Sequence, residues 1–276
     1  MSYLIYIIIF LFGLAIGSFI NALIYRLYNQ KPIVGRVRSE CPHCGHILAW
    51  YDLIPILSFI MLIGRCRYCQ KKISWQYPVV ELTTGFLFVI IFFNTLNQFS
   101  PPAGGFNFSA FAEASADWQF SIILIRDWLI IFTLLFIFVY DLKYLLVEDI
   151  VVIPAAIFSL IVNIIIGGTI WKLLLAGGAA ALFFLLQYLI TKGKGIGLGD
   201  TRIGLFMGFA LGWPNIIVAI FFAYSIGLIV GLFLLLTRRR KIGAQVPLGP
   251  FLAMGTFIAL FWGDLIIKWY LDRLYL

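Results

Sequence analysis

Long runs without a charged side chain constrain this sequence more than any other feature. Residues 1–25 contain no charge, and residues 203–237 form a charge-free run of 35. About 20 apolar residues are enough for an α-helix to cross the hydrocarbon core of a bilayer. Charged residues make up only 12% of the chain, far below the usual content of soluble domains. The sequence therefore predicts an all-α, polytopic membrane protein and excludes a soluble enzyme, a disordered chain and a fibrous protein.

The runs predict about eight transmembrane helices. Gly-Trp-Pro-Asn at 212–215 divides the 35-residue run into two spans, because proline interrupts a helix. Residues 53–64 are apolar, but a segment of 12 is too short to cross. The N-terminal run lacks the basic start and cleavage site of a signal peptide, so we expect it to be retained. The expected spans are 1–25, 79–93, 121–140, 150–171, 173–191, 200–211, the remainder of 203–237, and 246–267, with 94–119 as an outer loop.

The positions of the cations predict the orientation. If residues 26–76 lie in the cytosol, alternating spans place sixteen of the 20 Lys and Arg residues on the same side. These are Arg26, Lys31, Arg36, Arg38, Arg65, Arg67, Lys71, Lys72, Lys143, Lys192, Lys194, Arg202, Arg238, Arg239, Arg240 and Lys241. Cytoplasmic loops are enriched in Lys and Arg, so both termini are expected outside. The positive charge then reflects topology, and we expect membrane lipids but no nucleic acid as partners.

All four cysteines lie in the segment 26–76, as Cys41-Pro-His-Cys44 and Cys66-Arg-Tyr-Cys69. Two C-x2-C pairs supply four thiolates, the tetrahedral ligand set of a structural Zn²⁺. The competing interpretation is two disulfides, which a reducing cytosol disfavours. His43 and His46 are interpreted as bystanders of a four-cysteine site. The sequence therefore predicts a zinc-ribbon-like insertion stapled by one structural zinc ion.

Five acidic residues fall near the predicted cytosolic face: Glu81, Asp141, Glu148, Asp149 and Asp200. Asp141 follows an apolar run, and Asp200 ends the segment Gly-Ile-Gly-Leu-Gly-Asp before another. Carboxylates near bilayer depth are costly, and two of them at one face suggest a dyad that shares a proton. Composition alone equally allows two ordinary acids at helix ends.

Several motifs occur together in one order. They are Gly13-Leu-Ala-Ile-Gly17-Ser-Phe-Ile-Asn21 with Arg26, the cysteine pairs, Tyr77-Pro-Val-Val-Glu81, Asp141 to Asp149 followed by Pro154, and Gly197-Leu-Gly199-Asp200-Thr-Arg202-Ile-Gly204. In these features the chain resembles the bacterial type IV prepilin peptidases, membrane aspartic proteases of the G-x-G-D type. The resemblance extends over most of the chain.

The resemblance implies that Asp141 and Asp200 are the catalytic aspartates. Gly197, Gly199, Asp149 and Glu81 are then expected to support the site. It also implies cleavage of prepilin or pseudopilin leaders at the cytosolic face of the inner membrane. Methylation of the new N-terminus with S-adenosylmethionine is expected to follow.

Residues 1–120, with the cysteine insertion at about 26–76, are expected to serve methyl transfer, and residues 121–276 peptide cleavage. Three features depart from the family pattern: Glu148 where proline is usual, Arg202 where lysine is common, and a long outer loop at 94–119. No Gly-rich nucleotide loop is visible, so methyl transfer depends on the resemblance alone.

Three other interpretations are compatible with parts of the sequence. A transporter could place Asp141 and Asp200 in an ion pathway, and a preflagellin-type peptidase would share the G-x-G-D motif without methyl transfer. A membrane scaffold could use the zinc insertion to bind a partner. The sequence predicts neither the residues that bind S-adenosylmethionine nor the oligomeric state.

Overall fold

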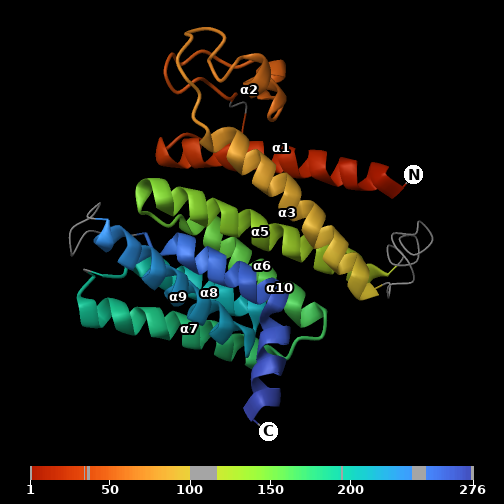
Figure 1. The fold of residues 1–276 in the computed structure, drawn as a ribbon, viewed down its shortest axis with the longest axis vertical. Coiled ribbons are helices and arrows are strands. Elements are labelled where there is room, and N and C mark those ends of the chain that lie inside the picture. The colour runs from red at the N-terminus through yellow and green to blue at the C-terminus, as the bar shows by residue number, and fades with distance from the viewer. Residues whose placement is uncertain are drawn as a thin grey trace. The chain divides into compact units, whose positions relative to one another are not determined.

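The computed structural model describes residues 2–33, 35, 38–99, 117–193, 195–237 and 247–274. In this part of the chain the regular elements are helices, accompanied by two isolated β-bridges, Glu40 with Ile47 and Arg65 with Lys72 (Figure 1). The helices are α1 Ser2–Tyr28, the short 3-10 helix η1 Trp50–Leu53, α2 Leu57–Met61, α3 Gln76–Phe99, α5 Trp118–Tyr144, α6 Asp149–Ile165, α7 Ile170–Thr191, α8 Leu198–Leu211, α9 Asn215–Leu236 and α10 Gly249–Leu274.

Eight of these helices occupy the ranges expected for membrane spans. Six of them are long and apolar enough to cross a bilayer: α1, α3, α5, α7, α9 and α10. The other two are shorter, with 17 residues in α6 and 14 in α8. At about 1.5 Å per residue, α8 is roughly 21 Å long and falls short of the hydrocarbon thickness. The expected count of eight spans is therefore corrected to six full-length candidates and two short helices.

Two expected boundaries also change. α5 continues to Tyr144, so Asp141 lies within its last turn and not beyond its end. The break between α6 and α7 lies at Gly167 and Gly168, which places Trp171 inside α7. The Arg238–Lys241 cluster, Arg36, Lys194 and residues 100–116 of the expected outer loop lie outside the described residues.

The described chain divides into two compact units, Met1–Phe132 and Thr133–Leu276. In the first unit α1 crosses α3 at very short range. A Cβ on Gly17 would lie 2.6 Å from the Cα of Glu81, and one on Gly13 would lie 2.8 Å from the Cα of Gly85. Glycines spaced four apart thus let the two backbones touch, as in many membrane helix pairs.

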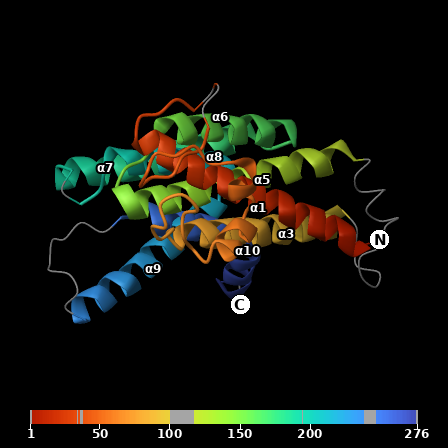
Figure 2. The same ribbon diagram turned by 90° about the horizontal axis from the view of Figure 1, so that it is seen from above.

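In the second unit α6 and α7 both pack on α8, and α9 packs on α10. The Asn163 side chain of α6 donates a hydrogen bond to the carbonyl of Phe209 in α8, at 2.7 Å. Figure 2 shows α6, α7 and α8 gathered together, with α9 and α10 crossing nearby. α8 is therefore enclosed by other helices, as its buried residues Ile203, Phe206 and Met207 require.

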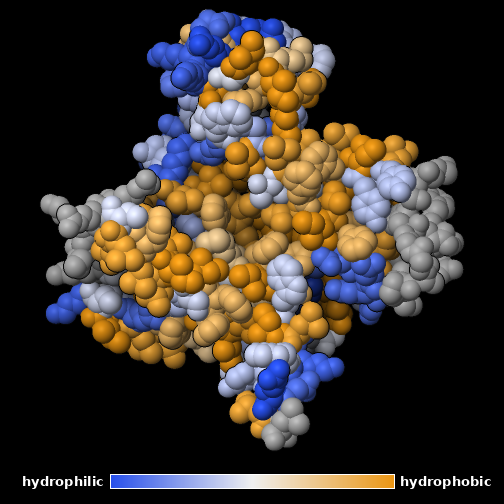
Figure 3. All heavy atoms as spheres, in the orientation of Figure 1, coloured by the Kyte–Doolittle hydropathy of each residue, from blue (hydrophilic) through white to orange (hydrophobic). Residues whose placement is uncertain are grey.

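The surface reflects the apolar composition. Figure 3 shows predominantly hydrophobic residues over the helices, while hydrophilic residues gather in the insertion between α1 and α3. Many large side chains of α7 and α9 are exposed, among them Leu186, Leu189, Leu228 and Leu232. Because a soluble protein does not expose faces of this kind, lipid is the solvent that they fit.

Candidate active site and metal centre

Asp141 and Asp200 are brought together from two helix ends. Asp141 lies in the last turn of α5, and Asp200 lies in the first turn of α8. Their exposed fractions are only 6% and 8%, and the charge of Asp141 acts on Asp200. The two carboxyl groups that the sequence singled out are therefore buried neighbours in the second unit.

Asp141 is positioned by the start of α10. The backbone N–H of Gly249 donates a hydrogen bond of 2.8 Å to Oδ2 of Asp141. A Cβ on Gly249 would lie 2.7 Å from that oxygen, so no larger residue fits without moving the carboxyl group. The sequence interpretation missed Gly249, although the surrounding Pro-Leu-Gly-Pro at 247–250 interrupts the chain where the last helix begins.

Asp200 is positioned by the turn that precedes it. Gly197 is the N-cap of α8, and its N–H donates a 2.9 Å hydrogen bond to Oδ2 of Asp200. This bond is the half of a capping box in which an acid at the third helical position reaches back to the cap. A Cβ on Gly199 would lie 2.6 Å from a methyl group of Val147, so the loop before α6 packs directly on this turn.

Two further acids fix that loop. Glu148, the N-cap of α6, accepts a 2.5 Å hydrogen bond from the hydroxyl group of Tyr140. Asp149 forms an ion pair of 2.6 Å with Arg202 of α8. The loop between α5 and α6 is thus tied to both aspartate-bearing helices. Glu148 accepts this hydrogen bond with its side chain, and a proline at the same position has no side-chain acceptor.

The pair has the arrangement needed for general acid–base chemistry. In each carboxyl group the structure gives one hydrogen bond, from a backbone N–H, although a carboxylate can accept about four. The remaining oxygen sites can therefore bind water or a substrate. Two close carboxylates cannot both ionise easily, so one can hold a proton while the other acts as a base.

The four cysteines converge in the first unit. All four sulfur atoms of Cys41, Cys44, Cys66 and Cys69 lie within 4.8 Å of one another, and none forms a disulfide. The sulfur atoms of Cys41 and Cys69 are 3.9 Å apart. A tetrahedral zinc site with Zn–S bonds of about 2.3 Å has sulfur atoms about 3.8 Å apart. The donors therefore fit a zinc ion, and the disulfide alternative is absent from the structure.

The two cysteine turns repeat one backbone pattern. Cys41 N–H donates to the carbonyl of His46, and Gly45 N–H donates back to Cys41. In the second turn the N–H of Cys66 donates to the carbonyl of Lys71, and the N–H of Gln70 donates to the carbonyl of Cys66. The sequence separations are the same as in the first turn. Gly45 and Gln70, at equivalent positions, both have positive φ. Each turn is thus a separately closed knuckle that presents two thiols. His46 instead packs its ring on Tyr68, with centroids 3.6 Å apart.

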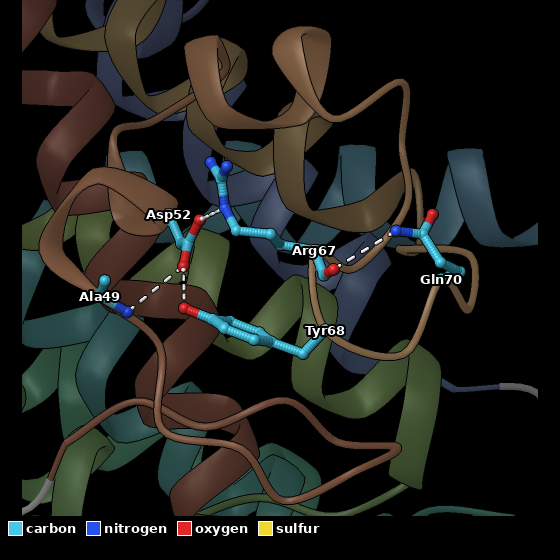
Figure 4. Close-up of polar contacts among 5 residues, drawn as sticks. All are labelled: Ala49, Asp52, Arg67, Tyr68 and Gln70. Carbon is cyan, nitrogen blue, oxygen red and sulfur yellow. Dashed lines mark hydrogen bonds and ion pairs between the residues drawn. The ribbon is translucent and has the colours of Figure 1, made fainter.

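A buried acid connects the second knuckle to the rest of the insertion. Asp52 accepts hydrogen bonds from Nε of Arg67 at 2.8 Å, from the hydroxyl of Tyr68 at 3.1 Å and from the N–H of Ala49 (Figure 4). Burial opposes its charge, but these three donors together lower the pKa of Asp52 below its ordinary value. Arg67 and Tyr68 are the two residues between Cys66 and Cys69, so the metal turn and η1 are held as one body.

Glu81 lies at the crossing of α1 and α3. Its side chain is buried and accepts a 2.8 Å hydrogen bond from the N–H of Ile56, with a second bond to the side chain of Ser18. Glu81 forms no ion pair with Lys71 or Lys72, the lysines that precede α3, and both of these lysines lie at exposed positions.

Asn21, another buried polar residue of α1, has a structural role. Its side chain donates to the carbonyl of Tyr77 and accepts from the side chain of Gln76. These bonds attach α1 to the first turn of α3. Glu81 therefore lies on a helix start that is fixed independently of the insertion.

Two protein families match successive parts of the chain. Residues 11–95 match the bacterial peptidase A24 N-terminal domain, and residues 128–232 match the type IV leader peptidase family. Asp141 and Asp200 lie in the second match, and all four cysteines and Glu81 lie in the first. No solved structure matches the chain.

Curated relatives match over almost the full length. A prepilin leader peptidase/N-methyltransferase of Bacillus subtilis is 31% identical, over 96% of this chain and 97% of its own. The protein of the same description from Aeromonas hydrophila is 30% identical, over 99% and 96%. That of Pseudomonas aeruginosa is 29% identical, over 95% and 92%. The chain belongs to the prepilin leader peptidase/N-methyltransferase family.

Proposed function

We propose that this chain is a membrane aspartic endopeptidase that removes the leader of prepilins or pseudopilins and then methylates the new N-terminus. The observation that carries the proposal is the buried pair Asp141 and Asp200, each held by one backbone N–H at a helix end. An ion pathway would not require each carboxyl group of this pair to be held by a backbone N–H, from Gly197 and from Gly249 at the start of α10. The names of the relatives supply the substrate class.

In the proposed cleavage step, one aspartate removes a proton from water and the water attacks the scissile carbonyl. The other aspartate donates its proton to the carbonyl oxygen, which gives a gem-diol. As the C–N bond breaks, the first aspartate passes the proton taken from water to the leaving amine, and the second aspartate regains a proton from a hydroxyl group of the diol. The ties of Glu148 to Tyr140 and of Asp149 to Arg202 hold α5 and α8 while charge moves between the carboxyl groups. Gly197 and Gly199 support this geometry without contacting substrate.

We propose that the aspartates face the cytosol. In the second unit Lys143 and Arg202 lie at the helix ends that carry the aspartates, and Lys192 caps the end of α7 that leads to the start of α8. The opposite ends carry Lys172, Lys268 and Arg273. In the first unit the cation-rich insertion joins the end of α1 to the start of α3. Because cytoplasmic loops are enriched in Lys and Arg, the insertion is also expected in the cytosol. The protein would then be a multi-pass inner-membrane enzyme that takes its substrate from the cytosolic face.

We assign methyl transfer to residues 1–120 and cleavage to 121–276. Methyl transfer needs a group that accepts a proton from the new amine, and Glu81 is an acid of the first part that is buried where α1 crosses α3. S-adenosylmethionine would be the methyl donor. A zinc ion on Cys41, Cys44, Cys66 and Cys69 would be structural, because a closed shell of four thiolates leaves no open position.

Cleavage is tested with purified protein in nanodiscs and a synthetic prepilin peptide. We expect one new N-terminus, produced without added metal or nucleotide, and its methylation only when labelled S-adenosylmethionine is present. Cleavage without methylation under both conditions would favour the preflagellin-type alternative. No cleavage of any prepilin or pseudopilin peptide would reject the peptidase and leave the transporter or scaffold interpretation.

The role of Glu81 is tested by Glu81→Gln, with Glu40→Gln as the matched control in the insertion. We expect at least about a tenfold loss of methyl transfer to already cleaved peptide, with cleavage within about threefold of wild type. Glu40→Gln removes only the partner of Lys31 and Tyr25 and should leave both activities in place. Equal loss of both activities in Glu81→Gln would make Glu81 a packing residue.

A further inference from the structure

The apolar stretch 53–64 is not used by either proposed activity. The stretch begins at Leu53, the last residue of η1, and contains the single turn α2, Leu57–Met61, between the two cysteine knuckles. Leu57, Ile60 and Met61 stand at i, i+3 and i+4, the spacing of one helix face. Ile60 is 64% exposed, Met61 70% and the following Ile63 85%. The most apolar part of the insertion thus presents its large side chains outward.

The insertion bends back along α1, so that α2 lies beside the middle of α1 and not beyond the C-terminal end of that helix. Ile56, directly before α2, donates its N–H to Glu81, and Glu81 touches Gly17 of α1. Gly17 precedes Tyr28, the last residue of α1, by eleven positions, which corresponds to about 16 Å at ~1.5 Å per residue. Figure 1 shows the same relation within this unit: α2 lies over the body of α1 and not beyond its C-terminal end.

The exposed face of α2 continues into an exposed apolar stripe on α3. Phe59 of α2 packs against the ring of Trp75, with centroids 5.0 Å apart. From Trp75 the large exposed side chains follow at helical spacing along one side of α3: Val79, Leu82, Phe86, Ile90 and Phe93. Because α3 is long and apolar enough to span a bilayer, this stripe is its lipid-facing side. The α2 face therefore extends a surface that already meets lipid.

The neighbouring residues match the headgroup layer. Trp75 is largely exposed at the start of α3, where tryptophan marks the boundary between hydrocarbon and water. Arg65, Lys71 and Lys72 are exposed on the chain that leads from α2 to Trp75. An apolar face bordered by tryptophan and cations is the composition of a segment that lies in the interface of a bilayer.

We infer that Leu57–Ile63 is a re-entrant interfacial segment, inserted into the phospholipid layer beside α3, while the two cysteine knuckles stay in water. The occupant of its exposed face is the bilayer itself. Lipid contact then presses α2 against Trp75 and keeps the N–H of Ile56 on Glu81. An insertion wholly in the aqueous phase would leave Ile60, Met61 and Ile63 in water without compensation.

The methionines of the full chain allow a direct test. The sequence contains four, Met1, Met61, Met207 and Met254, and Met207 is fully buried. The protein is labelled with ¹³C at the methionine methyl groups and placed in nanodiscs, and Met61→Leu assigns the Met61 signal. Broadening is compared between phospholipid with a nitroxide on the upper acyl chain and a water-soluble gadolinium chelate. Ile47→Met, on an exposed apolar position of the first knuckle, provides the matched control.

We expect the lipid nitroxide to broaden Met61 several-fold more than the chelate does, and to leave Met207 unchanged. The additional methyl signal of the Ile47→Met variant should respond in the opposite way, to the chelate and not to the lipid. Broadening of Met61 by the chelate at least equal to that by the lipid would overturn the inference, and so would broadening by neither reagent. The Met61 measurement is made on wild-type protein and uses neither a peptide substrate nor S-adenosylmethionine, so its result is separate from the proposed activities.

Discussion

The two compact units bury acidic side chains in different ways. In the first unit Glu81 is bonded to the backbone of Ile56 and to Ser18, and no other carboxyl group is described beside it. In the second unit Asp141 and Asp200 each accept one hydrogen bond from a backbone N–H, and the charge of Asp141 acts on Asp200. Glu81 is therefore a single acid with its hydrogen bonds satisfied, whereas the aspartates form a pair whose remaining acceptor sites are not occupied by the described residues.

The supports of the two sites differ as well. Glu81 receives its bond from a loop of an insertion with few buried apolar residues, in which Cys41 and Cys66 are the buried hydrophobic positions described. A metal is the natural staple for such a segment. The aspartates are held by helix ends inside a packed bundle that includes the buried Ile203, Phe206 and Met207. The geometry around Glu81 should therefore depend on bound metal, and the geometry of the aspartate pair should depend on helix packing.

The largest effect is expected from Asp141→Asn and Asp200→Asn. Each should lower prepilin cleavage by about 10³-fold or more, because an amide can neither accept nor release the proton. Zinc content and methyl transfer to already cleaved peptide should remain at wild-type levels. Peptide cleavage by mass spectrometry gives the measurement. Asp149→Asn should retain more activity than either, and exposed Asp272→Asn should behave as wild type. Substantial cleavage by either purified single variant would falsify the dyad.

The second largest effect is expected from metal removal, which should affect the first unit and leave the second unit largely unchanged. Purified protein should contain one Zn²⁺ per chain, and a chelator should speed hydrogen exchange at the amides of Cys66 and Gln70 by about 100-fold. The amides of α8 should keep their protection, and cleavage should fall less than methyl transfer. Metal analysis and exchange by mass spectrometry provide the measurements. Zinc-free protein with an intact disulfide would contradict the assignment.

A glycine substitution should probe the support of the aspartates. Gly249→Ala places a methyl group 2.7 Å from Oδ2 of Asp141, so the carboxyl group must turn away. We expect cleavage to fall about 10- to 100-fold, since small misplacements of reacting groups are costly. Gly178→Ala, where nothing lies within 4 Å, is the matched control. Equal activity of the two variants would show that the Gly249 contact does not position Asp141.

The smallest effect is expected at the acid that braces the metal turn. The pKa of Asp52 is lowered in the native structure, so its contribution to stability is present at neutral pH and lost only as the pH falls through that lowered value. Asp52→Asn at pH 7 should therefore speed exchange in the second knuckle by about tenfold, leaving zinc stoichiometry unchanged. Gln70→Ala, which removes a longer bond to Arg67, should have less effect. Unchanged exchange in Asp52→Asn would mean that the metal alone holds the turn.

The amino-acid sequence was enough to predict the helical membrane architecture and the four-cysteine cluster, and it singled out Asp141 and Asp200 as a candidate pair. These depend on local patterns: charge-free runs of helical length, two C-x2-C pairs and carboxylates beside apolar helices. The break at 212–215 was predicted from its proline and glycine, and the structure begins α9 at Asn215. Helix ends were less accurate, because α5 and α8 are extended by packing and capping that a run of apolar residues does not encode.

Which groups complete each site follows from the three-dimensional fold and not from the local sequence. Gly249 lies 108 residues from Asp141, Ile56 lies 25 from Glu81, and Arg67 lies 15 from Asp52. Each bond joins an ordinary backbone or side-chain donor to an acid from another element, so neither partner has an unusual local sequence. The position of α2 along α1 also depends on contacts between residues that are distant in the sequence. A hydropathy pattern records how apolar a segment is, whereas the crossing of Gly17 and Glu81 and the bond to Ile56 determine where that segment lies.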